Sequence, residues 1–401
     1  MDISKKIIEF SPPYIDEREC EAVINVLKSN WITTGPKVRE FENLLKEFCQ
    51  TEKALCLNSA TAGLELVLRI MEIGDGDEVI TTPYTFAATS NVILHTGAKV
   101  IFADVEKDSF NIDPKEIEKL ITSKTKAVIS VDIAGVPVKY KEIIEVLNNK
   151  KQLYIPKKGT YQEKIDRPLF LSDAAHSFGS LYDGRPIGSI ADFYVLSFHA
   201  VKNLTTGEGG AILFNSLNDL SSEEIYKKIK LYSLHGQSKD ALAKLNSGNY
   251  KYTIDLAGYK YNMMDIAAAI GIEQLKKYNS EIMPKRKKIY ETYCNELSND
   301  KRFILPKKRD DINYHIFPLR LKDYNEEDRD KVIMKLFENG IHANVHFIPL
   351  PLQPLYKNLG FKMEDYPNAY NQYKNEISLP IYPSLKTDDL LYIIEKLKKF
   401  E

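Results

Sequence analysis

The chain has 401 residues, of which 43% are hydrophobic and 28% are charged, and its formal net charge is −1. This composition is ordinary for a globular protein, and the near-neutral charge gives no electrostatic reason to expect a nucleic acid or an anionic membrane as a partner. No apolar run reaches the roughly 18–20 residues that span a bilayer, and residues 1–10 lack the apolar core of a signal peptide.

The cysteines point to a reducing compartment. Cys20, Cys49, Cys56 and Cys294 are scattered along the chain without the spacing of a metal site. Such a pattern is typical of reduced and mostly buried thiols. We therefore expect a cytoplasmic protein without a metal centre.

The first segment to single out is a turn between two predicted helices, over 16–29 and 38–48, whose apolar residues have helical spacing. The turn reads WITTGP and contains Trp31, the only tryptophan, and Thr33. A Gly-Pro turn is common in any loop, so the turn alone does not indicate a function.

A candidate anion site follows the predicted strand 53–57. The sequence NSATAG, residues 58–63, opens a helix that extends to about residue 71. Free backbone N–H groups and the helix dipole at such a start attract an anion, with Ala60 and Thr61 as donors. An ordinary helix N-cap explains the same residues.

Strands and helices then alternate along the chain. Strands are predicted over 77–82, 99–104, 127–132 and 168–171, and helices after 83–89 and over 114–121 and 140–148. Alternation of this kind predicts an α/β fold with a mostly parallel sheet. Residues 150–167 are charged and contain Pro and Gly, which predicts an inserted loop or hairpin.

Two residues stand where ligands bind in such sheets. Asp173 follows the strand that ends at Leu171, at the carboxyl edge of the sheet, although a helix N-cap is an alternative role. Lys202 lies between two apolar runs, 193–196 and 211–214, among small and hydroxyl residues. Desolvation there lowers the pKa of the lysine and suits it to form a Schiff base with a carbonyl. A surface lysine in a hairpin is the alternative.

The C-terminal part has a different character. Helices are predicted over 265–275, 284–297, 328–340 and 388–400, and strands over 314–321 and 342–347. We expect a large domain over residues 1–280 and a small α+β domain over 281–401.

The stretch SFHAVKNLTTGEGG, residues 197–210, resembles the lysine motif of the DegT/DnrJ/EryC1/StrS family of PLP-dependent nucleotide-sugar aminotransferases. Further segments resemble family motifs in the same order: WITTG, NSAT, PYTFAAT, SDAAH and GYKYN. The resemblance implies the fold of the fold-type-I PLP-dependent transferases and a homodimer.

The resemblance also implies roles for individual residues. Lys202 would carry the cofactor and move the proton, and Asp173 would pair with the pyridinium nitrogen of PLP. The expected cofactor contacts are Ala60, Thr61, Phe86, Asp173, Ala175, His176, Ser197, Lys202, Lys260 and Asn262. Lys260 and Asn262 stand in a GYKYN variant of the family's G-x-N-x-R segment, which reaches the partner subunit's phosphate. The expected substrate contacts are Trp31, Thr33, His346 and Tyr356.

The implied reaction is transfer of an amino group, from glutamate, to C4 of a 4-keto-6-deoxy sugar linked to UDP or dTDP, in surface polysaccharide or glycan biosynthesis. A C3 sugar aminotransferase, an aminocyclitol aminotransferase and a PLP-binding regulatory protein without turnover are alternatives. Dehydratases of the family have a histidine in place of the lysine, so Lys202 argues against that activity.

Overall fold

The computed structural model describes residues 6–240 and 251–399. Its main feature is a seven-stranded sheet in the order β1-β9-β8-β5-β4-β2-β3. The strands are β1 (Lys53–Leu57), β2 (Glu78–Thr81), β3 (Lys99–Phe102), β4 (Thr125–Val131), β5 (Leu169–Asp173), β8 (Phe193–Ser197) and β9 (Gly210–Phe214). β9 pairs antiparallel with β1 and β8, and all other neighbours are parallel. The predicted α/β fold with a mostly parallel sheet is confirmed.

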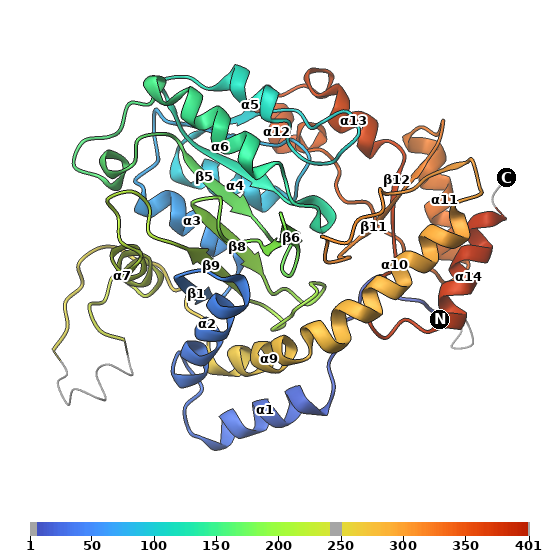
Figure 1. The fold of residues 1–401 in the computed structure, drawn as a ribbon, viewed down its shortest axis with the longest axis horizontal. Helices are drawn as coiled ribbons and strands as arrows, with labels where there is room; N and C mark the ends of the chain where they lie inside the picture. The colour runs from blue at the N-terminus through green and yellow to red at the C-terminus, as the bar shows by residue number, and fades with distance from the viewer. Residues whose placement is uncertain (1–5, 241–250, 400–401) are drawn as a thin grey trace.

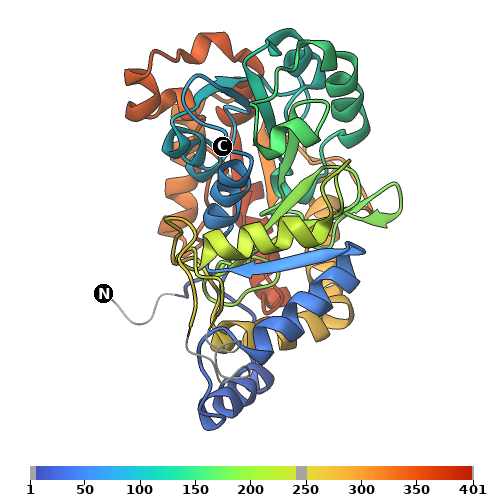
Figure 2. The ribbon, with the colours of Figure 1, turned by 90° about the vertical axis from the view of Figure 1, so that its left-hand side faces the viewer.

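Helices cover both faces of this sheet (Figure 1). In β1, Leu55 and Leu57 join one core cluster, and Ala54 and Cys56 join the other, because successive strand side chains point to opposite faces. The first face packs against α3 (Ala60–Ile70), α4 (Ala87–Thr96) and α7 (Ser222–Ser233). The second packs against α2 (Pro36–Cys49), α5 (Pro114–Leu120), α6 (Tyr140–Asn149) and α9 (Asp265–Lys276). Figure 2 shows α7 lying along β1.

A second, antiparallel sheet lies in the C-terminal part, with β10 (Phe303–Ile304), β11 (Phe317–Leu321) and β12 (Glu376–Leu379). Its core also receives Ile8, which bridges to Ile341, so the described N-terminal segment lies beside the C-terminal elements (Figure 1). Helix α1 (Glu17–Lys28) packs on α9, and β6 (Leu181–Tyr182) and β7 (Arg185–Pro186) form a short hairpin. The other α-helices of the C-terminal part are α10 (Met283–Leu297), α11 (Glu326–Glu338), α12 (Pro354–Asn358), α13 (Pro367–Tyr373) and α14 (Thr387–Lys398).

The division into two domains at residue 280 stays a prediction. Residue 280 falls in a π-helical segment, Tyr278–Ile282, that connects α9 and α10 without an intervening loop. None of the helices in the described ranges is long and apolar enough to cross a membrane.

The prediction of a strand over 342–347 is wrong. Within this segment only Asn344 forms a bridge, to Ser378 of β12. The next two backbone N–H groups donate to side chains instead: Val345 N to Asn344 Oδ1, and His346 N to Glu376 Oε2. A ladder cannot continue where its donors are used in this way.

One further strand differs from its prediction. The strand expected from residue 314 starts at Phe317, because Tyr314 has a φ of 53°. The segment 150–167, for which a loop or a hairpin is expected, is a loop with two 3₁₀ turns, Lys151–Leu153 and Tyr161–Lys164. The last predicted helix was placed up to Phe400, which lies outside the described residues.

Candidate active site

A cavity of about 570 Å³ lies at the edge of the large sheet where β5 and β8 end. β1 also ends there and β9 begins there, because β9 pairs antiparallel with both β1 and β8 through Gly210. The structure brings these predicted site residues to the cavity wall: Ala60, Thr61, Phe86, Asp173, Ala175, His176, Ser197, Lys202 and His346. Residues more than 280 positions apart in the sequence therefore share one cavity.

The start of α3 forms one end of the cavity. Ser59 caps this helix, with its Oγ accepting from Ala62 N at 3.1 Å. Gly210 of β9 packs directly beneath, since a Cβ at this position would lie 2.4 Å from the carbonyl carbon of Ser59 and 2.5 Å from Ala60 N. The first N–H groups of a helix have no partner within the helix, so this end of the cavity suits an anion.

Asp173 forms the charged floor of the cavity. It is buried, its Oδ2 accepts from Thr89 Oγ1 at 2.8 Å, and its Oδ1 accepts from Ala175 N at 3.2 Å. Burial raises the pKa of Asp173, and the two donors and the charge of Lys202 oppose that rise. The carboxylate is thus held in place to pair with a cation in the cavity.

Lys202 lies in the connection between β8 and β9. The connection is closed at its base by Phe198 N, which donates to Gly209 O, and contains a turn in which Lys202 N donates to His199 O, each at 2.9 Å. Burial lowers the pKa of Lys202 to about 8, while Asp173 acts in the opposite direction. A sizeable fraction of this amine is therefore neutral near pH 7–8, as a nucleophile or a base requires.

Histidines and a phenylalanine form the opposite wall. Burial, and next the charge of Lys202, hold the pKa of His176 well below its usual value, so the ring is neutral. Its Nδ1 accepts from Ala134 N at 3.4 Å, which leaves the proton on Nε2 as a donor. The ring of His176 stacks on Phe347 at 5.6 Å and lies edge-on to His346 at 6.3 Å between centroids.

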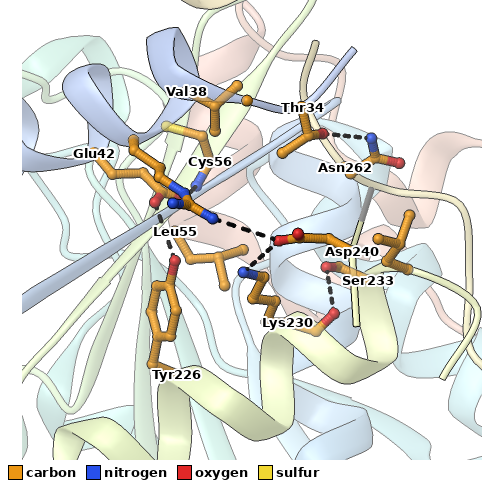
Figure 3. A pocket seen from close by; sticks show the side chains of 13 residues that line it. Thr34, Val38, Glu42, Leu55, Cys56, Tyr226, Lys230, Ser233, Asp240 and Asn262 are labelled. Carbon is orange, nitrogen blue, oxygen red and sulfur yellow. Dashed lines mark hydrogen bonds and ion pairs between the residues drawn. The ribbon is translucent and has the colours of Figure 1, made fainter. Parts of the chain in front are cut away.

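Four predicted residues, Trp31, Thr33, Lys260 and Asn262, do not line the cavity. The segment with Lys260 and Asn262 runs along the start of α3, where Asn58 N donates to Tyr261 O at 2.7 Å. Asn262 Nδ2 donates to Thr34 Oγ1 at 2.6 Å, in the turn that contains Trp31 and Thr33 (Figure 3). Within the described residues, the buried Oδ1 of Asn262 has no hydrogen-bond donor.

The structure does not bring Tyr356 to the cavity. The side chain is 1% exposed, its hydroxyl donates to Asn91 Oδ1 at 2.8 Å, and its ring packs against Phe102. The expectation that Tyr356 contacts substrate is therefore corrected: it is a core residue under the cavity wall.

Four further residues of the site were not identified from the sequence. Thr89 supports Asp173, and Gln353, Phe347 and Ile348 line the cavity. Thr89 lies in the first turn of α4 and within the PYTFAAT segment, a position that could have indicated it. The other three come from a loop whose position depends on the second sheet, and no local pattern indicates them.

Known proteins match nearly the whole chain. The model of the DegT/DnrJ/EryC1/StrS aminotransferase family matches residues 13–398. The chain is 38% identical to the spore coat polysaccharide biosynthesis protein SpsC of Bacillus subtilis (strain 168), over 98% of this chain and 96% of that protein. It is 33% identical to the UDP-4-amino-4,6-dideoxy-N-acetyl-beta-L-altrosamine transaminase of Helicobacter pylori (strain ATCC 700392 / 26695), over 99% of this chain and 98% of that protein.

Solved structures agree in fold. Spr1654 from Streptococcus pneumoniae in its PLP form superposes with a TM-score of 0.93 at 41% identity, over 98% of each chain. Its PMP form gives the same TM-score at 43% identity. The expected fold of the PLP-dependent transferases is thereby confirmed.

Proposed function

Because this chain belongs to the DegT/DnrJ/EryC1/StrS aminotransferase family, we propose that it transfers an amino group from glutamate to C4 of a UDP- or dTDP-linked 4-keto-6-deoxy sugar. It is a PLP-dependent sugar aminotransferase. The observation that carries the proposal is that Lys202, Asp173 and the start of α3 meet in one cavity.

The residues of the cavity fit PLP. The start of α3, with Ala60 and Thr61, would hold the phosphate together with Ser197, and the close packing of Gly210 keeps that end open to an anion. Phe86 is 64% exposed at the cavity rim, where its face is free to lie on a ring. PLP supplies an electron sink when it is bound.

The protein's own groups would then do three things. The carboxylate of Asp173 would hold a positive charge at the floor of the cavity. Lys202 would attach the cofactor and, when released, move a proton as a base of suitable pKa. His176 would donate from Nε2 to an oxygen of the bound ring.

The relatives support the substrate class. The H. pylori relative is named for a UDP-linked 4-amino-4,6-dideoxy sugar, and SpsC is named for polysaccharide biosynthesis. We extend both properties to this chain as part of the proposal. Glutamate as the donor rests on the family resemblance.

We also propose that the enzyme is a homodimer in the cytoplasm. Lys260, Asn262, Trp31 and Thr33 lie together beside the cavity, and the unpaired Oδ1 of Asn262 leaves an acceptor for a donor from outside the described residues. The ammonium of Lys260 would meet the phosphate of the partner subunit's cofactor. All four cysteines are free, in line with a reducing compartment.

The reverse reaction tests the proposal. The PLP form is incubated with 2-oxoglutarate and each of a panel of amino-sugar nucleotides, and glutamate is measured. We expect turnover with UDP- or dTDP-linked 4-amino-4,6-dideoxy sugars. Turnover restricted to 3-amino sugars would contradict the regiochemistry, and turnover restricted to a free aminocyclitol would contradict the nucleotide. No turnover with any amine, despite bound PLP, would favour a regulatory protein.

A further inference from the structure

His346 lines the cavity and is held by contacts that the family resemblance does not explain. Its backbone N–H donates to Glu376 Oε2 at 3.0 Å, and its carbonyl accepts from Tyr84 OH at 2.7 Å. Its ring stacks on Phe10, with centroids 5.4 Å apart and planes 24° apart. The ring is therefore fixed in one orientation, with one edge toward β12 and the other toward the cavity.

The edge toward β12 meets a buried polar pair. His346 Nδ1 lies 2.9 Å from Ser378 Oγ, and Ser378 Oγ lies 2.5 Å from Glu376 Oε1. Ser378 and Glu376 are both fully buried. β12 presents them two positions apart and hence on the same face of the strand. The backbone of Ser378 pairs with Asn344 in both directions, at 2.7 and 3.1 Å, which fixes the register of His346 against the pair.

Glu376, Ser378 and His346 can be hydrogen-bonded in two arrangements in which each contact has one donor and one acceptor. If Glu376 is ionised, Ser378 donates to Glu376 and His346 Nδ1–H donates to Ser378, so Nε2 is a bare acceptor. If Glu376 is protonated, it donates to Ser378 and Ser378 donates to Nδ1, so the ring proton lies on Nε2. The two arrangements differ by one proton, and the ring is neutral in both.

This inference rests on the proposed amination. We propose that Glu376, Ser378 and His346 form a proton relay, in which the buried carboxyl sets whether His346 presents a donor or an acceptor to the substrate.

The charges around the relay favour storage of the proton on Glu376 rather than on the ring. Burial, and next the charge of Lys202, lower the pKa of His346 to about 3, which disfavours an imidazolium. Burial raises the pKa of Glu376 to about 8, so the carboxyl titrates near the working pH.

Other charged and titratable groups surround Glu376 and the ring of His346, the two ends of the relay. Arg329 of α11 donates to the backbone oxygen of Glu376 at 3.2 Å, and its charge opposes the rise of the Glu376 pKa. Arg320 of β11 stands opposite Glu376 in the register, but its guanidinium donates to Asn375 and Gln372. On the cavity side, the ring of His346 faces His176, and Tyr84 lies behind its carbonyl. His315 is edge-on to His176.

The relay has a use in the proposed reaction. When nitrogen replaces the oxygen of a ketone, the C–O bond breaks and the oxygen leaves as water, so the oxygen takes up the two protons that the amine nitrogen loses. His346 Nε2–H would give one proton to the leaving oxygen. The proton of Ser378 then passes to Nδ1, and that of Glu376 passes to Ser378, which leaves Glu376 ionised. A proton returned from the nitrogen through Nε2 restores the starting arrangement, and Lys202 would carry the second proton from the nitrogen to the oxygen.

The test uses the PLP form of the enzyme, labelled with ¹⁵N-histidine and without substrate. Protonated and bare ring nitrogens have distinct ¹⁵N shifts, and His346 is assigned among the seven histidines by its absence in His346→Gln. We expect Nε2 of His346 to be protonated well below pH 8 and bare well above it. An unchanged Nε2 between pH 6.5 and 9.5 would overturn the relay.

Glu376→Gln gives the sharper result. In this variant the amide oxygen of residue 376 must accept from His346 N, so its NH₂ group donates to Ser378 Oγ. Ser378 then donates to His346 Nδ1, and the ring proton stays on Nε2 at every pH. The pH-dependent change in the ¹⁵N shift of His346 Nε2 should therefore vanish in this variant. An NMR titration like that of the wild type would overturn the proposal. If this variant fails to fold, Ser378→Ala serves instead, because loss of the hydroxyl disconnects the ring from Glu376 and must also remove the titration.

Glu42→Gln is a matched control. Glu42 is another carboxyl whose pKa burial raises, here to about 7, but its partners are Cys56 N and Tyr226 OH, in a separate small pocket (Figure 3). The control should leave the His346 titration in place. Because the spectra need no substrate, they report on the relay even if the proposed sugar is wrong, and the amino-sugar panel reports on the sugar even if the relay is wrong.

Discussion

Asp173→Asn separates the charge of the cavity floor from its hydrogen bonds. Asp173 Oδ1 accepts from Ala175 N, and Oδ2 accepts from Thr89 Oγ1. In the variant, the amide oxygen still accepts from Ala175, while the NH₂ donates to Thr89 Oγ1. The Thr89 proton can then turn to Thr85 Oγ1, which is 2.8 Å away. Every hydrogen bond has a replacement, so we expect the free energy of unfolding to change by about 1 kcal/mol or less.

The loss of charge has a larger effect on turnover. Two opposite charges about 4 Å apart attract by about 4 kcal/mol at an effective dielectric constant of about 20. If this attraction supports the electron sink throughout the reaction, its loss slows turnover by about 10³-fold. The assay is a single-turnover measurement of the PLP form with glutamate, with cofactor occupancy and thermal unfolding measured on the same sample.

Thr89→Val is the matched variant, since it keeps the charge and removes one donor. Loss of a hydrogen bond to a charged group costs about 1.5–3 kcal/mol, which predicts a rate between about tenfold and a hundredfold lower. A rate for Asp173→Asn within tenfold of the wild type would refute the reasoning. So would an equal effect of the two variants, because the hydrogen bond rather than the charge would then explain the loss.

The other predictions concern Lys202 and the proposed dimer. Borohydride treatment of the PLP form should link the cofactor to the peptide that contains Lys202, and label on a different lysine would contradict that assignment. The pKa of Lys202 is lowered to about 8, so its amine is neutral above that value. The rate at which PLP attaches to the cofactor-free protein should therefore rise with pH and level off above about pH 8, and a rate that still rises at pH 10 would be inconsistent with this pKa. Lys260→Ala should weaken PLP binding but leave a dimer in sedimentation; unchanged PLP affinity argues against a crossing contact, and an active PLP-loaded monomer argues against the dimer itself.

The sequence alone determined the fold class and the chemistry of the cofactor. Apolar runs of strand length that alternate with helical patterns predicted the parallel sheet, because side-chain periodicity reflects local backbone geometry. Asp173 could be predicted because it stands at the carboxyl end of a strand, where ligands bind in parallel sheets, and Lys202 because it lies among small and hydroxyl residues between two apolar runs. Each family motif is a short contiguous stretch of sequence, so it can be recognised without knowledge of the fold. The predicted family, enzyme class and cofactor are confirmed.

Only the tertiary structure decided what supports and surrounds these residues. Glu376 and Ser378 belong to no motif identified in the sequence, and their role follows only from the position of β12 beside His346. Tyr356 lies in the core, where its hydroxyl donates to Asn91, a residue more than 250 positions away in the chain. The segment 342–347 has a strand-like pattern but forms no strand, since the N–H groups of Val345 and His346 donate to side chains. Such contacts depend on how separately folded elements pack together, and a local sequence pattern carries no information about a partner that is distant in the chain.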